Sequence, residues 1–236
     1  MKKRLVKLFT AGIVVFVSFK SVAQGASDHF RTKDSITRGK YTLVIVNDEA
    51  DFDPVTRQRM VDAFFTVYPK EASRFNRRTL KRVEFFIDPT YTGVAETGGG
   101  IARYNPKWLK SHPEDIDVVT HEVMHIVQDY RQENPGWLTE GIADYVRYVY
   151  GVNNLKSRWT LPDYKPTQSY TNAYRVTARF LLWVEKHHRK NLVDKLDSAL
   201  RAGTYRPDLW VKLTGKTVDE LWSEYGKNPS LELTYR

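Results

Sequence analysis

The sequence predicts an α+β protein, with a small mixed β-sheet in its N-terminal half and a mostly helical C-terminal half. Residues 41–46 and 82–87 are short apolar runs of the kind that form buried strands, and the residues between them repeat with helical spacing. From residue 116 onward, apolar residues recur every three or four positions, which is typical of amphipathic helices. The 236 residues include no cysteine, so the fold must rely on a hydrophobic core and not on disulfides.

The first 23 residues are predicted to be a signal peptide. Basic residues at positions 2–7 precede a short apolar run over 8–19, and Ser21-Val22-Ala23 resembles the small-x-small pattern of a cleavage site. The apolar run is shorter than the roughly 20 residues of a membrane span, although an uncleaved N-terminal anchor is the alternative. We therefore expect a secreted or periplasmic protein with no stable membrane insertion after cleavage.

Beyond the signal peptide we expect a polar linker over residues 24–39 and a single domain over 40–236. The formal net charge is +9, but five of the positive charges lie within residues 1–23, which contain no acid. The remaining excess of about +4 is weak for a nucleic-acid-binding protein, so we expect no nucleic acid partner.

The densest basic cluster is interpreted as solvated surface, and its alternative role is a contact with an anionic glycan or the cell envelope. It consists of Arg74, Arg77, Arg78, Lys81 and Arg82.

Residues 41–87 predict a β-α-β unit. Asp53 followed by Pro54 is the pattern of a helix N-cap with proline at the first helical position. Because a helical crossover joins the two strands, we expect them to be parallel. Further helices are expected over residues 172–188, 191–200 and 218–225, with glycine and proline between them.

Residues 121–125 read His-Glu-Val-Met-His and are the most informative stretch for function. On a helix, His121 and His125 project from one face, one turn apart, so both can reach one metal ion at about 2.0–2.1 Å. Glu122 is placed to act as general base toward a water on that metal. Apolar residues around the motif recur at helical spacing, which predicts a half-buried helix. The pattern indicates a zinc-dependent hydrolase and, among such hydrolases, favours a peptidase.

A catalytic zinc site takes three protein ligands, so a third is needed. Residues 134–136 form an Asn-Pro-Gly turn, after which a second helix should return antiparallel to the first. Glu140 could then complete a site of two histidines and one glutamate, and Asp144, one turn later, could accept the outer N–H of a ligating histidine. The alternatives are a first-turn acid for Glu140 and a surface salt bridge for Asp144.

Other third ligands fit less well. Asp129 continues the face of His125 but lies farther along the helix axis, and we expect it to cap or brace the helix. The metzincin continuation is absent, because Gln128 stands where its glycine should be and Arg131 where its third histidine should be.

These motifs resemble one known family. The His-Glu-x-x-His motif, the following Pro-Gly-Trp-Leu-Thr-Glu-Gly-Ile-Ala-Asp-Tyr-Val-Arg over residues 135–147, and the segment 174–183 are similar to those of the plant and bacterial basic secretory protein family. The resemblance extends over roughly residues 40–225. It implies a zincin-like fold of the gluzincin-like group, with His121, His125 and Glu140 as zinc ligands and Glu122 as the base.

The resemblance also implies a role for the glycine-containing segment 93–104. In zincins an edge strand beside the metal pairs with extended substrate, and this segment is the candidate for that strand. The alternative is a flexible hairpin loop without substrate contact.

The tetrahedral oxyanion of peptide hydrolysis needs a donor besides zinc. Tyr174 is the first candidate, because it begins a helix in the family-like segment, while Tyr145, Tyr148 and Tyr170 stay open. The predicted function is a secreted zinc metallopeptidase acting on peptides or proteins. The alternatives are a secreted binding protein on the same scaffold, or a zinc hydrolase of a cell-wall or glycan-linked substrate.

Overall fold

The computed structural model describes residues 30–130 and 134–235 of the chain. The predicted signal peptide therefore lies outside the described residues. The linker predicted over residues 24–39 is wrong in its second half, because strand β1 (Thr32–Arg38) lies there and pairs antiparallel with β2 (Tyr41–Asn47). Strand β1 is mostly polar and exposed at a sheet edge, so it lacks the apolar alternation that announces a strand.

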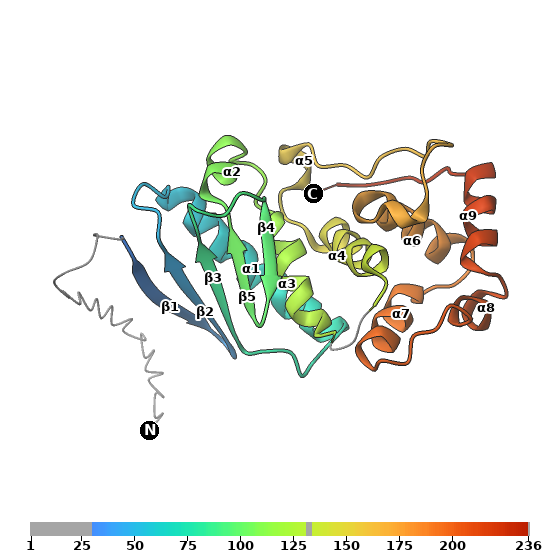
Figure 1. Cartoon of the computed structure of the whole chain (residues 1–236), viewed down its shortest axis with the longest axis horizontal. Helices are drawn as coiled ribbons and strands as arrows, with labels where there is room; N and C mark the ends of the chain where they lie inside the picture. Colours follow the sequence, from blue (N-terminus) through green and yellow to red (C-terminus); the bar gives the residue numbers. More distant parts are fainter. Residues whose placement is uncertain (1–29, 131–133, 236) are drawn as a thin grey trace, which may run out of the picture.

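Within the described residues, one five-stranded mixed sheet has the order β1-β2-β3-β5-β4 (Figure 1). Strand β3 (Arg82–Ile87) runs parallel to β2, and helix α1 (Pro54–Arg74) joins the two, which confirms the predicted β-α-β unit. The N-cap is also as expected, since the Asp53 carboxylate accepts hydrogen bonds from the backbone N–H of Val55 and Thr56.

A hairpin completes the sheet on the side away from β1. Strand β5 (Ile101–Tyr104) runs parallel to β3, and β4 (Ala95–Gly98) returns antiparallel to β5. The turn between them places Gly99 and Gly100 at φ angles of 57° and 83°, which glycine adopts without a side-chain clash. Strand β4 is thus the last strand of the sheet, and it lies beside helix α3 (Figure 1).

Two helices predicted from the central motifs are present. Helix α3 (Val118–Gln128) contains the His-Glu-x-x-His motif and is buried along almost its whole length, and α4 (Gly136–Tyr150) packs against it. The short helix α2 (Pro106–Ser111), which the sequence pattern did not predict, precedes α3. The predicted α+β class is confirmed, with a mixed sheet in the N-terminal half, the motif helix beside the last strand of the sheet and a mostly helical C-terminal half.

The C-terminal half is helical, as expected. Helix α6 (Tyr174–His187) packs closely on α4, and a methyl group at Gly141 would lie 2.2 Å from the Thr177 side chain. The remaining elements are shorter: α5 (Asn154–Ser157), a 3-10 turn (Tyr170–Asn172), α7 (Leu192–Arg201), α8 (Leu209–Thr214) and α9 (Val218–Lys227).

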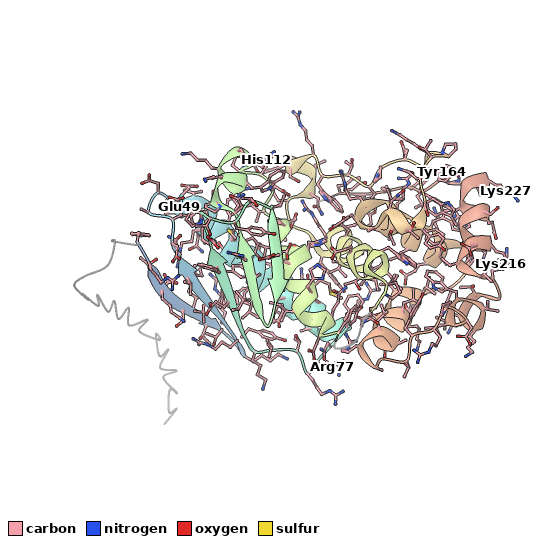
Figure 2. All side chains as sticks on the ribbon, viewed as in Figure 1. Glu49, Arg77, His112, Tyr164, Lys216 and Lys227 are labelled. Atoms are coloured by element: carbon pink, nitrogen blue, oxygen red, sulfur yellow. The ribbon has the colours of Figure 1, made fainter. Side chains whose placement is uncertain are left out.

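The basic cluster of residues 74–82 is only partly free surface. Arg74 makes an ion pair of 2.7 Å with Asp194, whereas Arg77 projects outward (Figure 2). None of the helices in the described part of the chain has the length and apolar character that a membrane crossing requires.

Candidate active site

Helix α3 places two imidazoles face to edge at the bottom of a cleft. The ring centroids of His121 and His125 are 4.8 Å apart with an interplanar angle of 80°, and their Nε2 atoms are 3.1 Å apart. The one-turn spacing therefore does what the sequence predicted, because both rings reach the same point from one helical face.

Helix α4 brings the Glu140 carboxylate to the same point. Its Oε2 lies 3.1 Å from Nε2 of His121 and 3.5 Å from Nε2 of His125. The ligand atoms of the three residues all lie within 4.8 Å of one another. Two neighbouring helices thus assemble the His-His-Glu set from positions 19 residues apart in the sequence.

The outer nitrogens of both rings have other partners. Nδ1 of His121 lies 2.7 Å from Oδ1 of Asp144, and Nδ1 of His125 lies 2.7 Å from Oε1 of Gln128. Each Nδ1–H therefore donates outward, and in a neutral ring this leaves the lone pair of Nε2 directed at the shared point. This donor set fits a divalent cation of the zinc type: two imidazole nitrogens and one carboxylate oxygen converge, with their tautomers fixed.

Gln128 was not predicted to have a part in the site. It holds His125 through its carbonyl oxygen and donates from Nε2 to the backbone oxygen of Thr139 at 2.9 Å, which links α3 to α4. Its position three residues after His125 on the same helical face was the available signal.

We call His121, His125 and Glu140 the metal trio. The charges around the trio favour a positive centre. Burial opposes protonation of His121, but Asp144, followed by Glu140 and Glu122, outweighs it and raises the pKa of the imidazole to about 10. Burial alone would raise the pKa of Glu140, yet hydrogen bonds with His121 and His125 hold the pKa of that carboxyl well below its usual range. The site therefore stabilises either protons or a cation at the same place.

The Glu122 side chain points toward the sheet edge. Its side chain is buried, with 5% exposed, and Oε2 accepts a hydrogen bond of 2.7 Å from the Thr97 hydroxyl on β4. The contact joins the motif helix to the edge strand and fixes one carboxylate oxygen of Glu122. Sequence reasoning did not identify Thr97.

Tyr174 lies over the trio from the start of α6. Its ring stacks on His121 with centroids 6.1 Å apart and an interplanar angle of 20°, and 53% of the residue is exposed. The negative charge of Glu140, followed by partial burial, raises the pKa of its hydroxyl. The other tyrosines considered are engaged elsewhere, since Tyr145 donates to Glu185 and Tyr170 to Asp219, while Tyr148 accepts from the backbone of Thr234.

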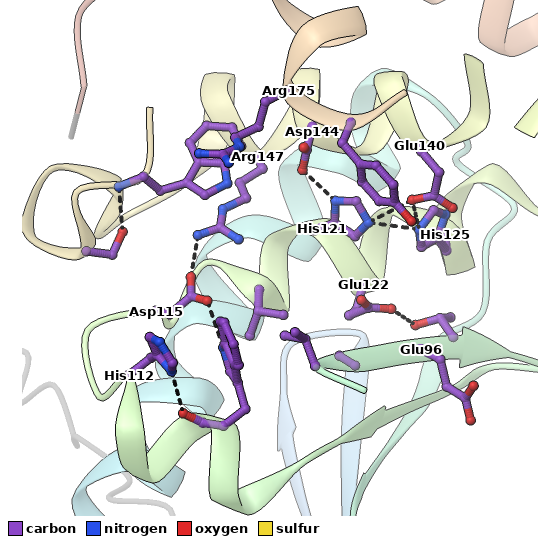
Figure 3. Close-up of a pocket in the computed structure, with 18 of the residues that line it drawn as sticks. Glu96, His112, Asp115, His121, Glu122, His125, Glu140, Asp144, Arg147 and Arg175 are labelled. Carbon is purple, nitrogen blue, oxygen red and sulfur yellow. Dashed lines mark hydrogen bonds and ion pairs between the residues drawn. The ribbon is translucent and has the colours of Figure 1, made fainter. Parts of the chain in front are cut away.

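The His-His-Glu set and the side chains that surround it line one cleft of about 1130 Å³ (Figure 3). They are Thr97, His121, Glu122, His125, Gln128, Glu140, Asp144 and Tyr174. Residues 94–97, which include part of β4, form one margin, α3 forms the floor, and α4 with the start of α6 forms the opposite wall. The segment proposed as an edge strand thus borders the cleft.

The fold and the site together define a zincin-like protein with a His-Glu-x-x-His helix and a His-His-Glu cluster. The chain matches the family described as a peptidase of plants and bacteria over residues 9–225, and it belongs to this basic secretory protein family of peptidases. No curated protein matches the chain.

Two solved structures are similar to this chain at low identity. One is a mutant two-domain M1 zinc metallopeptidase bound to L-tryptophan, with 13% identity and a TM-score of 0.45 over 86% of this chain and 49% of that one. The other is a mutant M1 zinc metallopeptidase from Deinococcus radiodurans, with 12% identity and a TM-score of 0.41 over 84% of this chain and 48% of that one. The chain spans about half the length of both.

Proposed function

We propose that this protein is a zinc-dependent metallopeptidase that hydrolyses peptide bonds with Glu122 as general base. The observation behind the proposal is the convergence of Nε2 of His121, Nε2 of His125 and Oε2 of Glu140, with Glu122 adjacent. A cation held by these three would polarise a substrate carbonyl and acidify water at the site.

The protein's own groups supply the remaining chemistry. Glu122 accepts the proton of the attacking water and delivers it to the leaving amine, and the Thr97 hydroxyl keeps one carboxylate oxygen in place for both transfers. Tyr174 lies against His121 with an exposed side chain, so its O–H is available to donate to the developing oxyanion.

We further propose that an extended peptide lies along β4. In the part of the chain that the structure describes, this strand pairs only with β5, so its other side can offer backbone donors and acceptors to a substrate. Such pairing binds the backbone of a peptide or protein without demanding one sequence.

We also propose that the protein acts outside the cytoplasm, as a secreted or periplasmic enzyme. The basic start, apolar run and small-x-small site within residues 1–23 support export. Ligands from histidine and carboxylate, in a chain without cysteine, are compatible with an oxidising compartment.

Metal analysis of the purified protein tests the proposal. We expect about one zinc ion per chain, with peptide hydrolysis that stops on adding a chelator and returns with zinc. Glu140→Ala should remove most of the bound metal and the hydrolysis. The matched control is Glu185→Ala, which removes a partly buried carboxylate from α6 outside the cleft and should keep the metal. Retention of zinc by Glu140→Ala would contradict the ligand set.

A further inference from the structure

The cleft has a second charged region besides the metal trio. Lys156, Arg158 and Arg175 all line it, and all three are exposed. Among residues 30–130 and 134–235, none of the three makes an ion pair with a carboxylate. We call this set the cationic wall.

Glu122, Glu140 and Asp144 belong to the metal site, and the other acids of the same cleft are engaged by arginines. Glu96 pairs with Arg103 at 2.9 Å, and Glu114 pairs with Arg59 at 2.7 Å. Asp115 is likewise held, by Arg147 at 2.5 Å. The positive charge of the cationic wall is therefore not neutralised from within the cleft, and it is available to an anionic group of a substrate.

Lys156 contributes least to the cationic wall, because its positive charge also acts on the Glu114 carboxylate. There it adds to the larger effects of Asn153 and Arg59, which lower the pKa of that carboxyl. The two arginines are the stronger part of the wall.

A contribution to local stability does not explain why arginine occupies position 158 or position 175. Arg175 lies in the first turn of α6, where a cation opposes the helix dipole. Within the described residues, its side chain is held only by a 3.3 Å hydrogen bond to the backbone oxygen of Thr160. Arg158 ends α5 with a φ of 57°, a left-handed conformation in which glycine is less strained.

The cationic wall lies to one side of the metal trio. In Figure 3, Arg175 lies past Asp144 as seen from the two imidazoles, whereas Glu122 lies toward the strand margin. A group bound at the wall would thus belong to a part of the substrate away from the bond that is cut.

We propose that the cationic wall is a substrate subsite that binds a carboxylate, either an acidic side chain or the C-terminal carboxylate of a peptide. Arginine suits this ligand, because its planar N–H groups can pair with both carboxylate oxygens. The proposal rests on the proposed peptidase function, and it names the substrate class as peptides that carry a carboxylate at a position away from the scissile bond.

Peptide binding to the Glu122→Gln variant, with zinc added, tests the subsite without turnover. Four fluorescent peptides share one core sequence and a blocked N-terminus. The first pair has an amidated C-terminus, and its members carry glutamate or glutamine at one position. The members of the second pair have a free carboxylate or an amide at the C-terminus. We expect a carboxylate to lower the Kd by about fivefold or more at low ionic strength, and salt to weaken the preference.

A charge-matched pair of variants assigns the preference to the wall. Arg158→Gly with Arg175→Gln should abolish it, and the glycine should not impair folding because of the φ of 57°. The control is Lys186→Gln with Arg189→Gln, which removes the same charge at the other end of α6, outside the cleft, and should keep the preference.

The outcomes separate the two proposals. Preference for glutamate alone assigns an acidic side chain, and preference for the free acid alone assigns the chain end. Equal Kd values for carboxylate and amide peptides, or a preference that survives Arg158→Gly with Arg175→Gln, would overturn the subsite. If the zinc-loaded parent protein hydrolysed no peptide but kept the binding preference, the peptidase function would be overturned and the subsite would be supported.

Discussion

On the wall formed by α3 and β4, the side chains that α3 turns toward the cleft are largely buried and hydrogen-bonded. On the wall formed by residues 156–159 and the start of α6, the charged side chains and Tyr174 are exposed and have few partners. On the α3–β4 wall, His121 and Glu122 are 8% and 5% exposed and are held by Asp144 and Thr97. On the α6 wall, Tyr174 is 53% exposed.

The two walls also differ in backbone conformation. Helix α3 is regular through the motif, while Arg158, Ala173 and Tyr174 have φ angles of 57°, 62° and 48°. A buried and regular wall fixes reacting groups before substrate arrives, which is what electrostatic catalysis requires. An exposed wall can change its side chains without disturbing the core, so it suits substrate selection. Changes on the α3–β4 wall should therefore affect every substrate, and changes on the α6 wall should depend on the substrate.

The largest expected effect is on the α3–β4 wall. Glu122→Gln removes the proton acceptor but keeps the shape and the Thr97 contact, so kcat should fall by about 10²- to 10⁴-fold for every peptide while bound zinc stays constant. Steady-state kinetics with metal analysis measures both. Glu96→Gln is the control, because Glu96 lines the same cleft but pairs with Arg103. A kcat in Glu122→Gln close to that of the parent would exclude Glu122 as the base.

Tyr174→Phe tests whether the α6 wall contains a catalytic group as well. Loss of one donor to the oxyanion should lower kcat by about 10²-fold with little change in KM. Tyr130→Phe removes a hydroxyl from the same cleft, but that hydroxyl is bound to Asp197, so kcat should stay near the parent value. A rise in KM alone for Tyr174→Phe would limit Tyr174 to substrate binding.

Asp144→Asn tests the support of the metal trio. An amide in place of the carboxylate weakens the bond to Nδ1 of His121, and zinc affinity should fall by about 10- to 100-fold in chelator competition, with most of kcat restored at saturating zinc. Asp197→Asn is the matched control, since Asp197 is also buried but pairs with Arg201. It should lower the free energy of unfolding and leave zinc affinity unchanged. Equal zinc affinities of Asp144→Asn and the parent would remove Asp144 from the metal centre.

The sequence predicted the α3–β4 wall better than the α6 wall, and local signals explain the difference. The spacing of His121 and His125, the turn before α4 and the N-cap at Asp53 are all set by residues close in sequence. These signals were enough to predict the β-α-β unit, the two central helices and the convergence of Glu140 on the histidines.

The features that were missed depend on contacts between distant segments. The bond from Thr97 to Glu122 requires the register of β4 against β5 and the position of α3 beside it, neither of which a local pattern contains. Strand β1 was missed because an exposed edge strand needs few apolar residues. The cationic wall is formed only when the start of α6 packs near residues 156–159, and Gly141 permits the close approach of α6 to α4.

The smallest expected effect concerns the strained backbone of the α6 wall. Ala173 has φ and ψ of 62° and −170°, a region that glycine enters at far lower cost, so alanine there destabilises the fold by about 1–2 kcal/mol. Ala173→Gly removes that strain but increases the entropy of the unfolded chain, and the net free energy of unfolding should rise by up to about 1 kcal/mol. Because Tyr174 is then less constrained, kcat should fall a few-fold while stability rises.

Urea denaturation and kinetics on the same samples measure the two opposite changes. Ala202→Gly is the control, since Ala202 caps α7 with an ordinary φ of −76° and should lose about 0.5–1 kcal/mol of stability. If Ala173→Gly were destabilising to the same extent, the α6 wall would hold no strain, and the contrast between the two walls would reduce to exposure alone. Opposite signs for the two glycine variants would show that the α6 wall keeps Tyr174 in place at a cost to the fold that the α3–β4 wall does not incur.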